Sequence, residues 1–167
     1  MSDSQHPYQG PPHQAARHIE GLFQKYGGKL TRVAALAQKV REGVQRIDPF
    51  IQQHTSMVCP RCQAVCCLNK HAYYNDEDFI YIHALGLTPH DYEQRDDTEP
   101  CQFLSQEGCR LERTVRPSGC NWYFCDALYE SMEKAGKAYD EFDDALWKLA
   151  ELWMEMIDEF KRVTEHT

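Results

Sequence analysis

The sequence predicts a mainly α-helical protein in which a long antiparallel helical hairpin flanks a small metal-stapled cysteine-rich domain of short helices and loops. Two observations indicate this fold class. Apolar residues recur at helical spacings on both sides of the middle of the chain, and all eight cysteines fall between Cys59 and Cys125. The expected division is a flexible tail at 1–14, N-terminal helices at 15–56, the cysteine-rich domain at 57–125 and a long amphipathic helix at 126–167.

The N-terminal part predicts two helices. The first covers about 15–26 and ends at Gly27-Gly28. The second begins near Thr31, and Pro49 is expected to kink or restart it because proline lacks the backbone N–H. The apolar residues of the second helix recur every three or four positions and so share one face; they are Val33, Leu36, Val40, Val44, Ile47 and Ile51.

The C-terminal segment 126–167 has the clearest helical periodicity. Gly136 interrupts it, but a glycine costs only about 1 kcal/mol relative to alanine in a helix, so one long helix is predicted. Its narrow apolar stripe alternates steps of four and three; it consists of Leu128, Met132, Ala135, Tyr139, Phe142, Leu146, Leu149, Trp153, Met156, Phe160 and Val163.

Charge indicates how the long helices pair. Segment 126–167 has 12 acidic and 5 basic residues and so carries −7 of the net charge of −8, whereas 25–46 has six basic residues and one acid. We expect these two segments to pack antiparallel. Nucleic acid is not expected as a partner, because phosphate binding needs a basic face and the largest charge patch of this chain is acidic. The surplus length of the last helix is expected to meet another helix, a protein partner or a second copy.

The chain is expected to be cytoplasmic. Residues 1–14 have neither the basic start nor the apolar run of a secretory signal, and no stretch has the roughly 20 apolar residues of a membrane span. In a reducing compartment, clustered cysteines bind metal more often than they form disulfides. We therefore expect the cysteines to bind a metal ion or cluster. No membrane is expected as a partner.

The spacing of the cysteines indicates metal ligands. Two intervening residues between Cys59 and Cys62 let both thiolates face one ion. Adjacent side chains diverge, so one of Cys66 and Cys67 is expected to serve a different centre, to support a ligand, or to act as a redox partner. Eight thiols fit two zinc sites or one iron–sulfur cluster, such as [4Fe-4S], with four thiols left over.

Other side chains near the cysteines could contribute to such a site. His71 and His54 could each replace a cysteine as a ligand, although a polar surface histidine is the ordinary alternative. Arg113 and Arg116 could stabilise thiolate charge or simply pair with acids such as Glu112. The sequence has no phosphate loop, dinucleotide fingerprint or Ser/His/Asp arrangement at a diagnostic spacing, so no catalytic residue is assigned.

Two short helices are expected inside the cysteine-rich domain. The first is capped by Asn75 or Asp76 and stopped by Gly86. The second opens at Thr88-Pro89, a typical helix N-terminus.

The order of the cysteines resembles a known family. Cys59-x2-Cys62-x3-Cys66-Cys67 is followed by Cys101-x-Phe-Leu, Gly-Cys109-x-Leu and Arg116-Pro117-x2-Cys120. Over about 59–125 this resembles the CxxCxxCC cysteine-cluster family, called YkgJ-like and described as zinc- or iron-chelating. The resemblance implies that seven cysteines form the metal-binding set: Cys59, Cys62, Cys66, Cys67, Cys101, Cys109 and Cys120.

Two features depart from the family pattern. Three residues separate Cys62 from Cys66 where the family name implies two, and Cys125 lies outside the core pattern. Cys125 is then an eighth ligand or a small buried apolar residue. The function expected from these patterns is metal binding by a structural or binding module, without assigned catalysis; the alternative is an iron–sulfur protein with redox or oxidoreductase activity.

Overall fold

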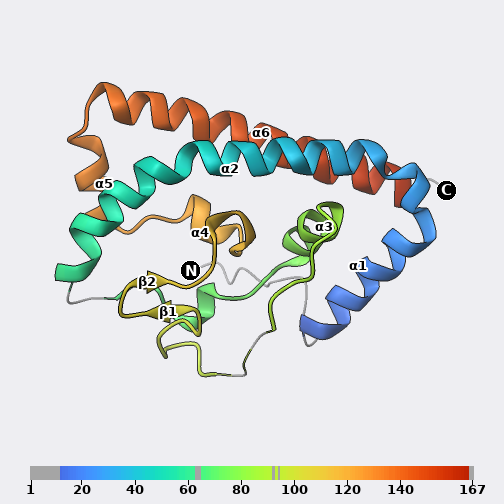
Figure 1. Cartoon of the computed structure of the whole chain (residues 1–167), viewed down its shortest axis with the longest axis horizontal. Helices are drawn as coiled ribbons and strands as arrows, with labels where there is room; N and C mark the ends of the chain where they lie inside the picture. Colours follow the sequence, from blue (N-terminus) through green and yellow to red (C-terminus); the bar gives the residue numbers. More distant parts are fainter. Residues whose placement is uncertain (1–11, 63–64, 92, 94, 166–167) are drawn as a thin grey trace, which may run out of the picture.

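The computed structural model describes residues 12–62, 65–91, 93 and 95–165 (Figure 1). The helices in this part are α1 (Pro12–Tyr26), α2 (Thr31–Val58), α3 (Asp76–Ala84), α4 (Gly119–Trp122), α5 (Asp126–Glu133) and α6 (Lys137–Glu165). The strands β1 (Leu104–Ser105) and β2 (Gly108–Cys109) pair antiparallel. Short 3₁₀ turns are η1 (Gly27–Lys29), η2 (Cys59–Arg61), η3 (Asn69–His71) and η4 (Arg113–Val115). No helix within these ranges combines the length and apolar character needed to cross a bilayer.

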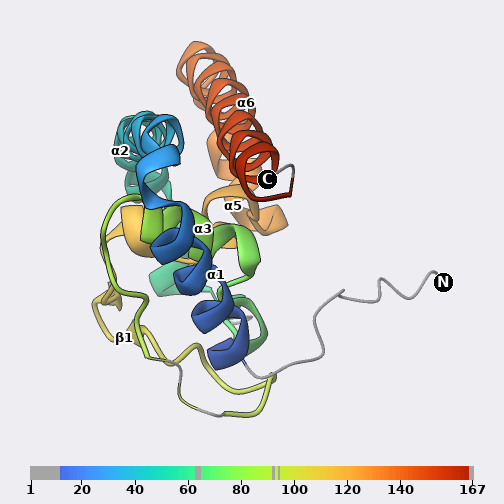
Figure 2. The ribbon, with the colours of Figure 1, turned by 90° about the vertical axis from the view of Figure 1, so that its right-hand side faces the viewer.

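α2 and α6 form the predicted antiparallel hairpin, and the two helices lie side by side in both views (Figures 1 and 2). Near the start of α2, the Arg32 Nη2 donates to Glu155 Oε1 at 2.9 Å. Near its end, the Phe50 ring stacks on Phe142 with centroids 4.6 Å apart. The start of α2 therefore lies beside the later part of α6, and the end of α2 lies beside the start of α6, so the two helices run antiparallel. The predicted pairing of a basic with an acidic helix is confirmed.

Helices α2 and α6 approach each other closely where they cross at Gly43 of α2. A Cβ placed on Gly43 of α2 would lie 2.9 Å from Leu149 Cδ1 of α6, which is nearer than real Cβ contacts allow. Both predicted apolar stripes meet around this crossing. The buried residues from them are Val33, Leu36, Val40, Val44, Ile47 and Ile51 on α2, and Leu128, Met132, Phe142, Leu149, Trp153, Met156, Phe160 and Val163 on α5 and α6.

The C-terminal segment is two helices, so the prediction of one long helix is wrong. Gly136 has a φ of +56°, in the left-handed region that glycine adopts without a Cβ clash. The turn closes with hydrogen bonds from Ala135 N to Met132 O and from Gly136 N to Glu133 O. α5 can therefore turn back and pack against α2 (Figure 1). Tertiary packing of α5 outweighs the small preference for a continuous helix.

Pro49 does not restart α2, which is continuous from Thr31 to Val58. A proline removes one backbone hydrogen bond, whereas the buried stripe on both sides of it, including Ile47 and Ile51, holds the helix against α5 and α6. The first predicted helix is confirmed as α1, with its start at Pro12. Residues 12–14 of the predicted flexible tail thus belong to α1, and residues 1–11 lie outside the described residues.

α3 begins as predicted and belongs to the helical core. Asn75 is its N-cap, and Gly86, with φ +69°, follows its end. The helix packs against α1, α2 and α6 (Figure 2). Trp153 Nε1 on α6 donates to Glu77 Oε2 at 2.7 Å. The first helix of the cysteine-rich segment is thus anchored to the hairpin.

No helix forms at Thr88-Pro89 in the described residues, and that prediction is wrong. The buried amide of Gln102 takes the hydrogen bonds that a helix would have made. Its Oε1 accepts from Glu93 N at 2.7 Å, and its Nε2 donates to Asp91 O at 2.8 Å. A side chain from a distant segment therefore satisfies this backbone in an irregular conformation.

Candidate metal centre

The eight cysteines come from six different places in the fold, and each is a thiol rather than half of a disulfide. Cys59 and Cys67 are exposed, whereas the other six are partly buried. Their positions follow from the elements above. Cys59 and Cys62 lie at and after η2, Cys66 and Cys67 precede η3, Cys101 precedes β1, Cys109 lies in β2, Cys120 lies in α4, and Cys125 is the N-cap of α5.

One set of thiols gathers where α2 ends and α5 begins. Burial raises the pKa of the Cys66 thiol to about 12, helped by the neighbouring thiols of Cys125, Cys67 and Cys59 and by a hydrogen bond with Cys125. Burial likewise raises the pKa of Cys59, as do its neighbours Cys67, Cys125 and Cys62. We call Cys59, Cys62, Cys66 and Cys125 the first thiol group.

A second set gathers around the β1–β2 hairpin. Burial raises the pKa of Cys120 to about 12, with further contributions from Cys109, Cys101 and Cys67, opposed by the cation of Arg116. The pKa of Cys67 is raised by burial and then by Cys101 and Cys109. We call Cys67, Cys101, Cys109 and Cys120 the second thiol group.

The two groups adjoin at the adjacent pair. The side chains of Cys66 and Cys67 are hydrogen-bonded to each other, and Cys67 also lies close enough to Cys59 to raise its pKa. Cys67 therefore has thiol neighbours in both groups, whereas the other thiol neighbours of Cys66 belong to the first group. Cys125, which the family pattern leaves out, lies in the first group beside Cys66.

Backbone hydrogen bonds hold the second thiol group in place. Cys101 N donates to Cys67 O at 2.9 Å, and Cys109 pairs with Leu104 across the two strands. Cys120 N donates to Pro117 O at 2.9 Å. Cys101 and Cys109 also pack against a small apolar cluster of Ala72, Phe103 and Leu111. The backbone segments that bear the cysteines of this group are thus held in place by the fold.

Two arginines support the second group in different ways. Arg113, only 4 % exposed, donates from Nε to Asp48 Oδ1 at 2.5 Å and from Nη1 to Cys120 O at 3.2 Å. It therefore ties α4, which bears Cys120, to α2. Arg116 donates from Nε to Leu111 O at 2.9 Å, and its charge favours the thiolates of Cys67 and Cys120. Of the two alternatives for Arg113, pairing with an acid is therefore observed, and the acid is Asp48.

A buried carboxylate that sequence reasoning missed also positions Ser118, the residue before α4. Asp78 Oδ2 accepts from Asn75 N, and its Oδ1 accepts from Ser118 N, both at 2.9 Å. Burial raises the pKa of Asp78 to about 6, against the lowering effect of these hydrogen bonds. The capping box of α3 has a sequence signal in Asn75 and Asp78, but the contact with Ser118 has none.

A large open cleft adjoins the thiols. Its volume is about 1550 Å³ and its walls come from α1, α3, α6 and the cysteine-bearing loops. Six cysteines line it: Cys59, Cys66, Cys67, Cys101, Cys109 and Cys120. His71 also lines this cleft, where its ring stacks on Tyr123 with centroids 5.2 Å apart. Burial and the charge of Lys70 lower the pKa of His71, which favours the neutral imidazole.

His54 packs against Phe50 and Ser131 in the helical core. Its ring tilts against Phe50 at 4.5 Å, and its Nδ1 lies 2.9 Å from Ser131 Oγ on α5. The side chain is buried between α2 and α5. It therefore serves the helical core in this structure.

In the described ranges, no three or more His, Cys, Asp and Glu side chains have the arrangement of a metal-ligand set. Comparison with protein-family models, curated proteins and solved structures found no match to this chain. The resemblance of 59–125 to the YkgJ-like family stays a prediction.

Proposed function

We propose that the chain binds metal at two centres, one in each thiol group, and acts as a metal-dependent binding or structural module. The observation that supports the proposal is the gathering of the thiols into two neighbourhoods, one around Cys66 and Cys125 and one around Cys101, Cys109 and Cys120, with Cys67 linking them. Four cysteine ligands are the usual complement of a structural zinc ion or an iron–sulfur cluster.

The sulfur ligands limit which metals the chain is expected to bind. Soft thiolates favour zinc or iron over hard cations such as magnesium and calcium, which take oxygen ligands. Neutral thiols packed together have raised pKa values, and a bound cation reverses this by stabilising the thiolates. Binding would draw each set of sulfurs toward a common centre, to about 2.3 Å from a zinc ion. It would also release protons, so affinity is expected to rise with pH.

The alternative function is an iron–sulfur protein with redox activity. The cleft beside the thiols favours it, because six cysteines line a space of about 1550 Å³ that a reaction partner could enter. A purely structural zinc site is closed by its protein ligands and needs no such access. The resemblance to a zinc- or iron-chelating family is compatible with both functions.

Anaerobic purification of the full chain, followed by metal analysis and absorption spectroscopy, distinguishes the two. Zinc predicts a colourless protein with about two zinc ions per chain. An iron–sulfur cluster predicts a brown protein with broad absorption near roughly 400 nm and about four irons per cluster. A chain that takes up neither metal, when supplied with each in turn, would overturn the proposal.

Matched serine variants test the division into two centres. Cys62→Ser and Cys101→Ser each remove one ligand, from the first and the second group respectively. Each should lose about half of the bound metal, because a centre that lacks one of four ligands is impaired while the other remains. Met57→Ala, an exposed neighbour of Cys59, serves as the control. Loss of all the metal in both serine variants would indicate one shared centre instead.

A further inference from the structure

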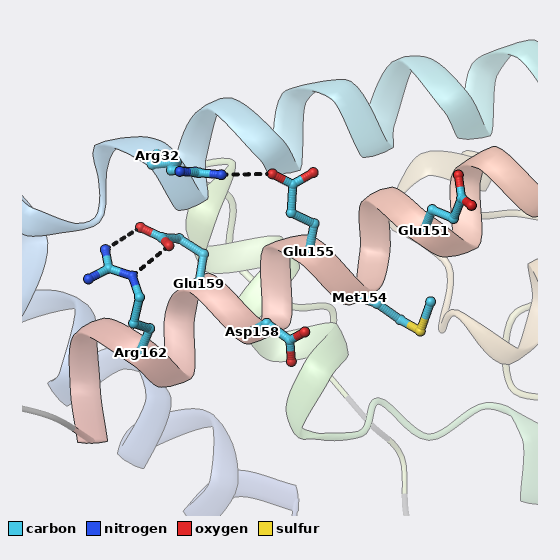
Figure 3. A pocket seen from close by; sticks show the side chains of 7 residues that line it. All are labelled: Arg32, Glu151, Met154, Glu155, Asp158, Glu159 and Arg162. Atoms are coloured by element: carbon cyan, nitrogen blue, oxygen red, sulfur yellow. Dashed lines mark hydrogen bonds and ion pairs between the residues drawn. The ribbon is translucent and has the colours of Figure 1, made fainter.

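The outward side of α6 exposes two large apolar side chains. Trp147 is 68 % exposed and Met154 is 58 % exposed. They are seven residues apart, which places them two helical turns apart on one side, about 10 Å along the axis. In Figure 3, Met154 extends from the side of α6 turned away from α2. Large apolar side chains that face solvent together are typical of contact sites.

Acidic residues flank this pair. Asp140, Asp144, Glu151 and Asp158 are exposed at helical spacing with Trp147 and Met154. Within the described residues, none of these four carboxylates makes an ion pair.

The acids nearer α2 differ from this outward set. Glu155 pairs with Arg32, and Glu159 pairs with Arg162, at one side of a shallow groove of about 450 Å³ that Glu151, Met154 and Asp158 also line (Figure 3). The carboxylates of Glu155 and Glu159 are therefore paired within the chain, whereas those of Glu151 and Asp158 make no ion pair in the described residues and can meet a partner.

We propose that this outward surface of α6, made of Asp140, Asp144, Trp147, Glu151, Met154 and Asp158, docks a basic amphipathic helix of another protein. Apolar side chains of that helix would cover Trp147 and Met154, and its Lys and Arg side chains would meet the flanking carboxylates. The same surface on a second copy would bring like charges together, and an anionic membrane would repel it. The surface lies on the hairpin, so the proposal does not rest on metal binding.

Fluorescence anisotropy with a labelled synthetic peptide tests this docking site. The probe is a peptide of about 18 residues with leucine and lysine at helical spacing, long enough for five turns. Its matched controls are a scrambled peptide of the same composition and a version with glutamate in place of lysine. Full-length protein should bind the probe more tightly than either control, with an affinity that falls as salt is added.

Variants locate the contact. Trp147→Ala and Met154→Ala should each weaken binding about tenfold or more, as expected for large side chains at the centre of an interface. Met57→Ala, which removes a methionine of similar exposure from α2, should leave the affinity unchanged. Trp147 emission should shift to shorter wavelength on binding, whereas Trp153 is already buried. Equal affinity for the wild type, Trp147→Ala and Met57→Ala would overturn the proposal.

Analytical ultracentrifugation tests whether a second copy of the chain occupies this surface instead. The proposed surface predicts that wild type and Trp147→Ala sediment with the same mass in the absence of peptide. A dimer of the wild type that Trp147→Ala abolishes would assign the surface to self-association and so overturn the proposal.

Discussion

The Oδ1 of Asp78 accepts a hydrogen bond from the backbone N–H of Ser118 at 2.9 Å, across 40 residues of sequence. The same carboxylate closes the capping box of α3 through Asn75. One buried acid thus joins α3 to Ser118, the residue that precedes α4 and its Cys120. Because Asp78 is buried, its ionisation is unfavourable in the folded state, and its pKa is raised to about 6.

This raised pKa predicts a pH dependence of stability. A carboxyl whose pKa is about 6 when folded and about 4 when unfolded binds its proton more tightly in the folded state. Its contribution to the free energy of unfolding is therefore larger below pH 4 and declines as the pH rises toward 6. Asp78→Asn cannot titrate and keeps an acceptor oxygen, so urea unfolding of this variant should lose that part of the pH dependence. Equal pH profiles for both proteins would contradict the assignment.

The ion pair of Arg113 and Asp48 predicts unequal effects of its two partners. Arg113 is 4 % exposed, whereas the Asp48 side chain is 41 % exposed. Asp48→Ala leaves a buried cation without its counter-ion and should cost about 3 kcal/mol of unfolding free energy. Arg113→Met leaves only a hydrated carboxylate and should cost less. Urea denaturation of both variants gives the comparison, and the reverse order would contradict the burial of Arg113.

The close crossing of α2 and α6 predicts that Gly43 does not tolerate a side chain. Gly43→Val should cost about 1–3 kcal/mol, because its Cβ would overlap with Leu149 of α6. Gly21→Ala on α1 is the matched control. Its new Cβ meets nothing within 4 Å, and alanine should stabilise the helix by up to about 1 kcal/mol. Thermal unfolding measures both changes, and stabilisation by Gly43→Val would place the two helices farther apart.

The second thiol group is expected to bind metal more tightly than the first. Strand pairing and backbone hydrogen bonds hold its cysteines, and Arg116 offsets thiolate charge. Cys62→Ser, which retains the second group, should therefore show higher affinity in a competition titration with a chelator than Cys101→Ser. Arg116→Gln should weaken the second centre about tenfold, as is usual for groups that support ligands. Equal metal affinities of the two serine variants would contradict the prediction that the second thiol group binds more tightly.

The helices of the hairpin were predictable because their signals are local or periodic. The apolar stripe from Val33 to Ile51 appears as the buried side of α2, and Asn75 caps α3 as its side chain requires. Thr88-Pro89 also has a local helix signal, yet Gln102 from a later segment satisfies that backbone without a helix. Local signals failed where a distant side chain supplied a better partner.

The sequence by itself determined a helical protein with an acidic helix against a basic one, and a thiol-rich segment between them. These properties follow from periodicity, net charge and cysteine spacing, which do not depend on long-range contacts. Only the tertiary structure decided the break at Gly136, the contact of Asp78 with Ser118 and the gathering of Cys67 with Cys101, Cys109 and Cys120. These features depend on which distant segments pack together, because packing sets the burial, and hence the energy, of each polar group.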